Sequence, residues 1–423
     1  MRILVLGAGG FIGRHIVAEL LKGGHQPVGA VRRAADFARA FPGAAAVACD
    51  LARDVAVADW LPRLAGVDAV VNAAGVLSGA GMEAVHVTAP RALYEACAQA
   101  DVKRVVLISA ISARPEVDTD YARAKLAGEK LLQDGPLDWT ILKPSLIVAK
   151  GSYGGTSLIR GLAGLPLFTP LVGDSHFAFS PLHAQDLARA VRVVCEEGRF
   201  SRQVLEPAGP EIISLRDLLS RYRTWLGLPP APYLSIPMGV MRGLAGLGDR
   251  MGRGPVSSNS LAQLIAGNEG DGERFAREIG FTPRSLAQFM AEEPAEVQDR
   301  WHARLFFMAP VLKFALALMW LLSGLIGFFT GLPLAQKVLA ALGLPSGLAM
   351  PVVVLTCLID LAICFLVLSG RKATVAQLIV IAGYTLALTF ALPVLWLDPL
   401  GPLLKNIPIV AAVLCHGVLR EQR

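Results

Sequence analysis

The sequence predicts an α/β domain with a doubly wound parallel sheet and a smaller second lobe, followed by a C-terminal bundle of four transmembrane helices. Three observations lead to this prediction. Short apolar runs alternate with helical stretches through residues 1–150, which is typical of a parallel sheet covered by helices. A glycine-rich turn joins the first apolar run to the first helix. From residue 301 onward, long apolar segments carry almost no charge.

Charge is divided unevenly along the 423 residues. Seven Lys or Arg residues and three acids follow Arg304, which leaves 33 basic and 31 acidic residues before them. The first part is therefore nearly neutral, and no nucleic-acid partner is expected. A mean hydropathy of +0.51 with 17% charged residues is too apolar for a purely soluble protein. The six cysteines show neither a C-x-x-C pair nor zinc spacing, so we expect reduced thiols and no metal site.

Six short apolar runs are predicted to be the strands of the sheet. They are residues 2–6, 27–31, 45–50, 67–75, 102–109 and 138–145. The main helical stretches among them are residues 14–25, 88–100 and 120–133. Such alternation produces parallel strands joined by right-handed crossovers. Residues 151–300 are less regular and richer in Pro and Gly, and we expect them to form the smaller substrate-side lobe of a domain that spans residues 1–300.

The turn after the first strand has the spacing of a dinucleotide-binding site. Its glycines follow the pattern G-x-x-G-x-x-G, directly after a strand and opening a helix, and this context makes the pattern informative. The first glycine permits the tight turn, the middle ones let the backbone approach a pyrophosphate, and the last lets helix and strand pack closely. The alternative is a merely structural turn. The predicted contacts are Gly7, Gly9, Gly10, Phe11, Ile12 and Gly13.

Two arginines at the end of the second strand favour NADP as the cofactor. A cofactor with a bare 2′-hydroxyl usually meets an acid there, whereas this sequence has Arg32 and Arg33. A guanidinium pairs bidentately with a 2′-phosphate. NAD remains the alternative, in which case both side chains are ordinary solvated arginines.

Further cofactor contacts are predicted where the later strands end. Asp50 ends the third strand, where it can accept a hydrogen bond from the adenine amino group or cap a helix. The backbone of "NAAG" lies at the end of the fourth strand and is expected to line the cofactor. The remaining predicted contacts are Leu51, Ala73, Ala74, Gly75 and Pro144.

Tyr121 and Lys125 are the candidate catalytic pair. They lie four residues apart in "DYARAKLAGEKLL", and therefore on one face of a predicted helix. A phenol with a pKa near 10 is a poor base at neutral pH. An ammonium one turn away favours the phenolate, so we expect Lys125 to lower the pKa of Tyr121. The alternative is a solvated helix surface.

Residues 301–423 are predicted to form a membrane domain. The four apolar segments approach or exceed the ~20 residues that cross a bilayer, and cover about residues 306–329, 350–369, 374–397 and 403–419. Four spans place both ends on one side. Six basic residues flank that side, against two on the other, which predicts a multi-pass protein of the inner membrane with both termini and residues 1–300 in the cytoplasm. The six are Arg300, Arg304, Arg371, Lys372, Arg420 and Arg423, and the two are Lys337 and Lys405.

Two polar residues fall at membrane depth, where polar groups are costly. Asp360 lies near the centre of the second segment and His416 in the last. We expect Asp360 to pair with Lys405 or His416. This pairing is either a structural hydrogen bond between helices or part of a proton relay or a contact to a quinone-like head group.

The first 290 residues resemble the short-chain dehydrogenase/reductase superfamily in its extended or atypical branch, which has a Rossmann fold. The likeness rests on "GAGGFIG", "CDL", "NAAG", "YARAK", "LKPS" and "PLHAQDLARAV". It implies that Tyr121 transfers the proton, that Lys125 holds the nicotinamide ribose, and that a serine after the fifth strand polarises the carbonyl. Ala110 and Ile111 stand at the usual serine positions. Ser109 and Ser112 flank them, and either is a candidate.

Within that superfamily, "YARAKLAGEKLL" and "ILKPS" are similar to the nucleotide-binding accessory subunit of respiratory complex I. That resemblance implies a structural NADPH. Residues 301–423 resemble the DoxX-like membrane family. We therefore expect a membrane-anchored NADP(H)-dependent oxidoreductase that acts on a carbonyl or quinone-like lipophilic substrate. The alternatives are a non-catalytic NADPH-binding scaffold or redox sensor in a membrane complex, and a functional bundle regulated by the nucleotide domain.

Overall fold

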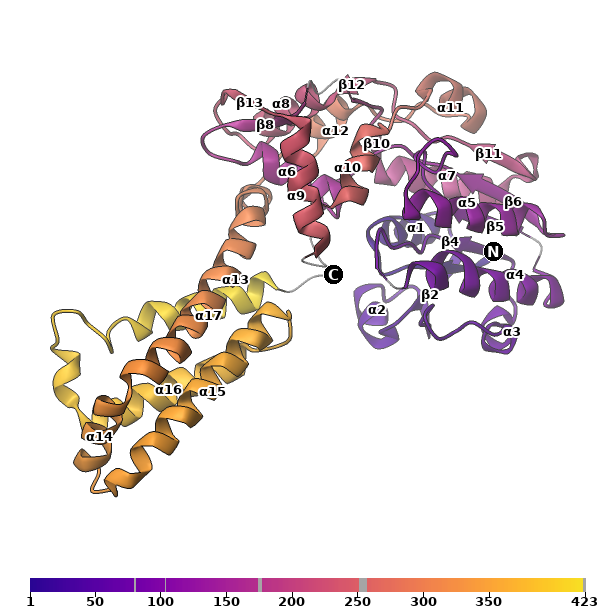
Figure 1. The fold of residues 1–423 in the computed structure, drawn as a ribbon. Helices are drawn as coiled ribbons and strands as arrows, with labels where there is room; N and C mark the ends of the chain where they lie inside the picture. The colour runs from indigo at the N-terminus through magenta and orange to yellow at the C-terminus, as the bar shows by residue number, and fades with distance from the viewer. Residues whose placement is uncertain (80, 103, 174–176, 251–256, 421–423) are drawn as a thin grey trace. The chain divides into compact units, whose positions relative to one another are not determined.

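The computed structural model describes residues 1–79, 81–102, 104–173, 177–250 and 257–420. The chain forms two compact units, Met1–Ala303 and Arg304–Arg423, and each is described by itself (Figure 1). Of the predicted topology residues, Arg423 lies outside the described residues.

A seven-stranded parallel sheet forms the centre of the first unit. Its order is β11-β6-β5-β4-β1-β2-β3, and every neighbouring pair is parallel. The strand order reverses between β1 and β4, as in doubly wound folds that bind dinucleotides at this point. The predicted parallel sheet is confirmed, with one strand more than expected. The strands are β1 Arg2–Leu6, β2 Gln26–Val31, β3 Ala45–Ala48, β4 Ala69–Asn72, β5 Arg104–Ile108, β6 Asp138–Leu142 and β11 Gln203–Leu205.

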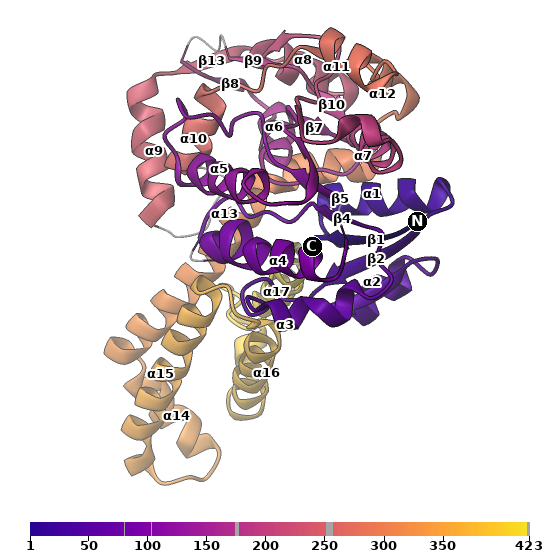
Figure 2. The ribbon, with the colours of Figure 1, turned by 90° about the vertical axis from the view of Figure 1, so that its right-hand side faces the viewer.

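Helices cover both faces of this sheet because the side chains of each strand alternate between two faces. In β1, Ile3 and Val5 belong to one core with α1 Phe11–Lys22 and α7 Ala184–Glu196. Leu4 and Leu6 of the same strand pack in a second core with α4 Ala89–Gln99. Figure 2 shows α1 and α7 on one side of the sheet and α4 on the other. The remaining helices of this half are α2 Ala34–Ala40, α3 Val57–Trp60, η1 Leu61–Leu64, η2 Ala84–Thr88 and α5 Asp120–Gln133.

A third hydrophobic core lies inside the smaller lobe. Buried Ile159, Leu218, Tyr222 and Phe289 come from three helices and pack together. The short strands of the lobe are β7 Ile147–Val148, β8 Thr169–Val172, β9 Ala178–Phe179, β10 Leu182–His183, β12 Ile213–Ser214 and β13 Tyr233–Ile236. Its helices are α6 Gly155–Ala163, η3 Gly198–Phe200, α8 Leu215–Trp225, α9 Met238–Arg250, α10 Ser258–Ile265, α11 Gly272–Ile279 and α12 Leu286–Glu292.

The second unit is helical and apolar. Among the described residues, three helical segments are long and apolar enough to cross a membrane: Val297–Thr330, Ser346–Leu368 and Thr374–Ala391. The fourth predicted segment, residues 403–419, is helical only from residue 406, because residues 402–405 form a turn and the last helix covers 14 residues. Gly401 just before this turn has a positive φ of 58°, a conformation that glycine adopts readily. The elements are α13 Val297–Thr330, α14 Leu332–Ala341, η4 Ser346–Leu348, α15 Ala349–Leu368, α16 Thr374–Ala391, η5 Pro393–Trp396 and α17 Asn406–Leu419.

Candidate dinucleotide and catalytic site

The glycine turn between β1 and α1 has no space for side chains at its two ends. Gly7 has a positive φ of 69°, and a Cβ there would lie 2.9 Å from Ala74 Cα. At Gly13 a Cβ would lie only 2.1 Å from the carbonyl oxygen of Gly7. Gly9 is less restricted, since its nearest neighbour would be Val31 Cγ1 at 3.6 Å. The backbone therefore requires glycine at the first and last positions, as a close turn under a dinucleotide does.

The first turn of α1 is suited to a phosphate. Gly10 precedes the helix, donates its N–H to the Gly7 carbonyl at 2.8 Å, and has no side chain to cap the helical N–H groups. No acid lies in the first turn. Phe11 and Ile12 pack against the core and hold the turn on the sheet. Free N–H groups at a helix N-terminus attract anions.

Arg32 and Arg33 follow β2 and are both exposed. Arg33 Nε lies 3.3 Å from the carboxylate of Asp36. Within the described residues, no acid pairs with Arg32. Of the two, Arg32 therefore has the guanidinium that is available to a 2′-phosphate.

Asp50 follows β3 and accepts a hydrogen bond from the N–H of Ala52 at 3.2 Å. Its own N–H donates to Asp54 at 2.7 Å. These bonds form a turn rather than a helix N-cap, because the next helix begins at Val57 with Ala56 as its N-cap. One carboxylate oxygen of Asp50 lies 3.7 Å from exposed Arg53. Leu51 packs its side chain against the core.

The end of β4 meets α5, the helix that carries Tyr121 and Lys125. Ala73 donates its N–H to Leu6 O at 3.2 Å, so the "NAAG" segment continues beside the glycine turn. Ala74 is buried. A Cβ on Gly75 would lie 3.5 Å from Lys125 Nζ and 3.4 Å from the ring of His86. The structure therefore brings these three residues together at the carboxyl edge of the sheet.

Lys125 lies on α5, buried, and donates from Nζ to the carbonyl oxygen of Ile108 at 2.9 Å. The same Nζ lies 6.0 Å from the centre of the Tyr121 ring. This arrangement joins α5 to the end of β5. Both members of the predicted pair lie at the edge where ligands bind in doubly wound folds.

The expected lowering of the Tyr121 pKa is wrong for this structure. Burial raises the pKa of Tyr121 to about 12. Burial also lowers the pKa of Lys125 to about 8, against the opposing effect of Glu129. Desolvation disfavours both charged forms, and it outweighs the attraction between ammonium and phenolate.

Ser109 lies in a buried polar cluster rather than free at the site. Its hydroxyl donates to the carboxylate of Glu129, which also accepts from Lys143 Nζ at 3.1 Å. Lys143 Nζ donates further to the carbonyl of Ala113 at 2.5 Å. The cluster connects β5, α5 and β6, and the sequence reasoning did not identify it.

Ser112 is buried, and its hydroxyl has no hydrogen-bond partner in the described part of the chain. Pro144 follows β6, and its carbonyl accepts the N–H of Ile111 at 3.0 Å. The segment after β5 is therefore anchored to the segment after β6. Of the two candidate serines, Ser112 is therefore the one whose O–H is not already donated to another residue.

His86 is a candidate site residue that the sequence reasoning missed. It lies in η2, 5% exposed, with Nε2 2.9 Å from Val76 O and its ring edge-on to Tyr121 at 5.9 Å. Burial lowers its pKa to about 4, with a contribution from Lys125. A Cβ on Gly128 would lie 2.5 Å from His86 O, so this glycine lets η2 approach α5. The sequence offered only an isolated histidine as a signal; the π turn that often marks functional sites is visible in the structure alone.

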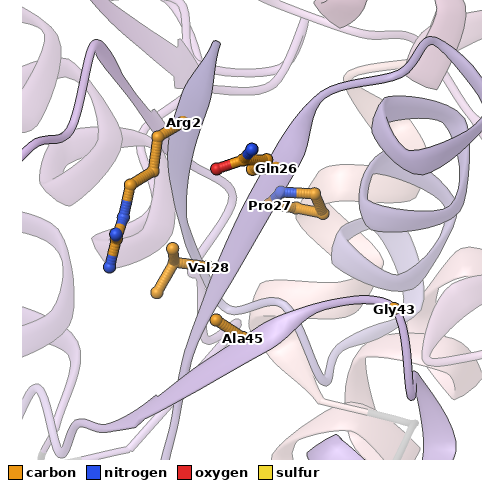
Figure 3. Close-up of a pocket in the computed structure, with 6 residues that line it drawn as sticks. All are labelled: Arg2, Gln26, Pro27, Val28, Gly43 and Ala45. Atoms are coloured by element: carbon orange, nitrogen blue, oxygen red, sulfur yellow. The ribbon is translucent and has the colours of Figure 1, made fainter.

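A hollow lies at the opposite end of the strands (Figure 3). Because ligands of doubly wound sheets bind at the carboxyl ends of the strands, this hollow at the amino ends is no candidate cofactor site. Its lining residues are Arg2, Gln26, Pro27, Val28, Gly43 and Ala45.

In the second unit, Asp360 makes neither expected pair. It accepts from Ser323 Oγ at 2.6 Å and from Tyr384 OH at 3.0 Å. These bonds join α13, α15 and α16, as the structural alternative predicts. Lys405 and His416 are not its partners.

Two family models match the chain. The NAD(P)H-binding model matches residues 7–161, and the DoxX-like family model matches residues 317–414. The chain thus has an NAD(P)-binding domain of the short-chain dehydrogenase/reductase type and a DoxX-like domain. Both family resemblances expected from the sequence are confirmed.

Two curated relatives are informative. A ceramide reductase of Caulobacter vibrioides is 30% identical over 202 residues, which are 46% of this chain and 60% of that protein. The mitochondrial NADH dehydrogenase (ubiquinone) 1 alpha subcomplex subunit 9 of Arabidopsis thaliana is 24% identical over 262 residues, 58% of this chain and 63% of that protein. The chain thus spans about three fifths of the length of these relatives.

Among solved structures, UDP-N-acetylglucosamine 4-epimerase from Bacillus cereus superposes with a TM-score of 0.54. It is 18% identical and covers 72% of this chain and 99% of its own. At this identity the likeness shows the fold alone, which agrees with the sheet described above.

Proposed function

We propose that this protein is a membrane-anchored NADP(H)-dependent oxidoreductase that reduces the carbonyl of a lipophilic substrate. One observation carries the proposal. Lys125, Gly75 and His86 meet at the carboxyl edge of the sheet, and the Tyr121 ring lies beside the side chains of Lys125 and His86. Residues 1–300 hold the cofactor and the chemistry, and residues 301–423 anchor them.

The residues present fit a nicotinamide dinucleotide. Gly7 and Gly13 leave no room for side chains, and the uncapped start of α1 offers N–H groups to a pyrophosphate. When bound, this cofactor supplies the hydride. Lys125 and the backbone at Gly75 would hold its nicotinamide half, and Arg32 would hold the 2′-phosphate that distinguishes NADP from NAD.

Tyr121 is suited to give a proton rather than to take one. With a pKa raised to about 12 by burial, it is protonated at neutral pH. An alkoxide that develops during carbonyl reduction is a stronger base than this phenolate and accepts its proton. The chemistry therefore favours reduction, with Ser112 as the hydroxyl that polarises the carbonyl and Ser109 held in the Glu129 cluster.

A lipophilic substrate agrees with the apolar second unit, because tethering raises the encounter rate with a membrane-dissolved molecule. The similarity to a protein named ceramide reductase supports a lipid substrate. We place both termini and residues 1–300 in the cytoplasm of an inner-membrane protein with four spans, of which the short apolar helix α17 is the fourth. The six-to-two distribution of flanking basic residues supports this orientation. A C-terminal green fluorescent protein fusion tests this, since it fluoresces when the C-terminus is cytoplasmic and stays dark when it is exported.

A non-catalytic NADPH-binding scaffold in a membrane complex is the second candidate. The observation that favours it is the engagement of Ser109 by Glu129, which removes one of two candidate hydroxyls. The similarity to a complex I subunit points in the same direction.

Single-turnover measurements separate the two functions. Purified protein loaded with NADPH is mixed with a lipid extract of its host membrane, and nicotinamide fluorescence is followed for the wild type and Tyr121→Phe. Oxidation of NADPH by the wild type but not by Tyr121→Phe supports the oxidoreductase function. Tight NADPH binding without oxidation in either protein supports the scaffold.

A further inference from the structure

Polar side chains lie inside the second unit, where the walls are otherwise apolar. Trp320 Nε1 on α13 donates to Gln377 Oε1 on α16 at 2.9 Å. Gln377 is 0% exposed, and His416 on α17 is 3% exposed. Their surroundings include Leu316, Ile381 and Val413, which pack in one apolar core with Trp320.

The bond from Trp320 fixes the orientation of the Gln377 amide. An indole N–H only donates, so the amide oxygen must face it and the Nε2 group must face elsewhere. Within the described residues, Nε2 of Gln377 has no hydrogen-bond partner, and neither has either ring nitrogen of His416. A fully buried N–H donor and a fully buried imidazole are thus left without protein partners.

Helices α16 and α17 run antiparallel side by side. A Cβ on Gly417 would lie 3.0 Å from Thr374 Oγ1, and Asn406 Nδ2 donates to Thr385 Oγ1 at 2.7 Å. These contacts set the register of the two helices along their length.

In this register the two unpartnered side chains lie near the same end of the helix pair. His416 directly precedes Gly417, and Gln377 lies one helical turn after Thr374. Val413, one turn before His416, is buried in the core that contains Trp320. The two groups therefore face the interior that α13, α16 and α17 share.

Unpartnered buried polar groups are expensive. Each costs about 1–3 kcal/mol when it is desolvated without a hydrogen bond, and hydrocarbon offers no partner. Asp360 in the same unit is a polar residue with a structural role, and both of its carboxylate oxygens accept hydrogen bonds. Gln377 Nε2 and His416 differ from it, and polar groups left in this way are suited to a ligand.

We propose that Gln377 and His416 bind the carbonyl oxygen of an uncharged lipophilic molecule within the second unit. A carbonyl oxygen has two lone pairs. Gln377 Nε2 offers one N–H to it, and His416 offers another in either neutral tautomer. The side chains around both groups are apolar, including Leu316, Ile381 and Val413, so the rest of such a molecule must be apolar and uncharged as well.

This site is separate from the dinucleotide site and needs no cofactor. Two sources of the carbonyl fit the same chemistry: a quinone ring and a long-chain ketone. Binding of each is therefore measured without NADPH, so that failure here leaves the proposed oxidoreductase function untouched.

The test uses the full chain in lipid nanodiscs, titrated with decylubiquinone in one arm and 2-tridecanone in the other. The thermal midpoint and tryptophan fluorescence are followed for the wild type, Gln377→Leu, His416→Leu and the control Thr389→Val. Thr389 bonds to Trp396 in the same unit but not to the proposed site. We expect one probe to raise the thermal midpoint of the wild type and of the control saturably. The apparent affinity for that probe is expected to be at least ten-fold weaker in both leucine variants.

The probe-free midpoint gives a second readout. His416→Leu removes two unpartnered nitrogens and is expected to raise the thermal midpoint measured without probe. If His416 made a structural hydrogen bond, the same substitution would lower that midpoint. The proposal is overturned when neither probe stabilises the wild type saturably, which means that the two side chains hold water only. Equal probe affinity in the wild type and both leucine variants overturns it as well.

Discussion

The hydroxyl of Ser109 donates to the carboxylate of Glu129, and both side chains are buried. Lys143 donates to the same carboxylate at 3.1 Å, so the group satisfies its own hydrogen bonds at the exit of β5. A serine held in this way stabilises the site rather than polarising a substrate. In the proposed reaction the proton transfer and the polarisation of the carbonyl then belong to Tyr121 and Ser112.

Replacing the two serines separates these roles. Ser109→Ala is expected to lower the free energy of unfolding by about 1 kcal/mol, because one acceptor position on Glu129 loses its donor, and to leave kcat within a few-fold. Ser112→Ala is expected to reduce kcat about 100-fold with unchanged stability. Turnover and urea unfolding are measured on both. A Ser109→Ala protein that is fully stable and inactive would contradict this assignment.

Gly13→Ala is expected to abolish NADPH binding. Its Cβ would lie 2.1 Å from the Gly7 carbonyl oxygen, so strand and helix must separate and the phosphate turn is lost. Gly135→Ala is the matched control, since its Cβ would meet only ordinary contacts from 3.5 Å outward. Fluorescence titration with NADPH measures both, and circular dichroism checks the fold. Unchanged affinity in Gly13→Ala would show that the cofactor binds elsewhere.

Arg32→Ala is expected to weaken NADPH binding about 10- to 100-fold while NADH binding changes little. A charge-assisted hydrogen bond to a 2′-phosphate contributes about 1.5–3 kcal/mol. Arg39→Ala is the control, because that exposed arginine pairs with Asp36 beyond the end of β2. Titrations with both nucleotides give the ratio of the dissociation constants for NADPH and NADH in each protein. Equal losses for NADPH and NADH would argue against a 2′-phosphate contact.

Stability between pH 8 and 10 is expected to reflect Lys125. Burial lowers its pKa from 10.5 to about 8 in the folded protein. In this window the unfolded chain binds the proton and the folded one does not, so the free energy of unfolding rises with pH, by up to about 3 kcal/mol in all. Above pH 10 the raised pKa of Tyr121 acts in the opposite direction.

Urea unfolding of the ligand-free full chain at each pH measures this dependence. In Lys125→Met the free energy of unfolding is expected not to rise between pH 8 and 10. Lys130→Met, which changes an exposed lysine of the same helix, is expected to keep that rise. Parallel curves for Lys125→Met and the wild type would mean that Lys125 keeps an ordinary pKa.

The sequence patterns predicted six of the seven sheet strands. Buried strands such as Arg2–Leu6 are near-continuous apolar runs, and a glycine turn that excludes a Cβ leaves a clear spacing. Strand β11 was missed because it has three residues, two of them exposed, and pairs only at the sheet edge.

The polar interactions were harder to predict. Glu129 is 20 residues from Ser109, and their bond depends on how α5 packs on the sheet. Burial likewise reversed the expected pKa shift of Tyr121, which four-residue spacing alone could not indicate. Asp360 found its partners on two other helices, where helix packing rather than charge decided the pairing.

The central claim is that hydride passes from NADPH to a lipid carbonyl in a reaction that needs Tyr121. Membranes that contain the full chain are supplied with NADPH deuterated at the transferable position, and their lipids are analysed by mass spectrometry. The account predicts a lipid alcohol carrying one deuterium with the wild type and none with Tyr121→Phe. Tight binding of the labelled NADPH with no deuterium in any lipid would contradict it.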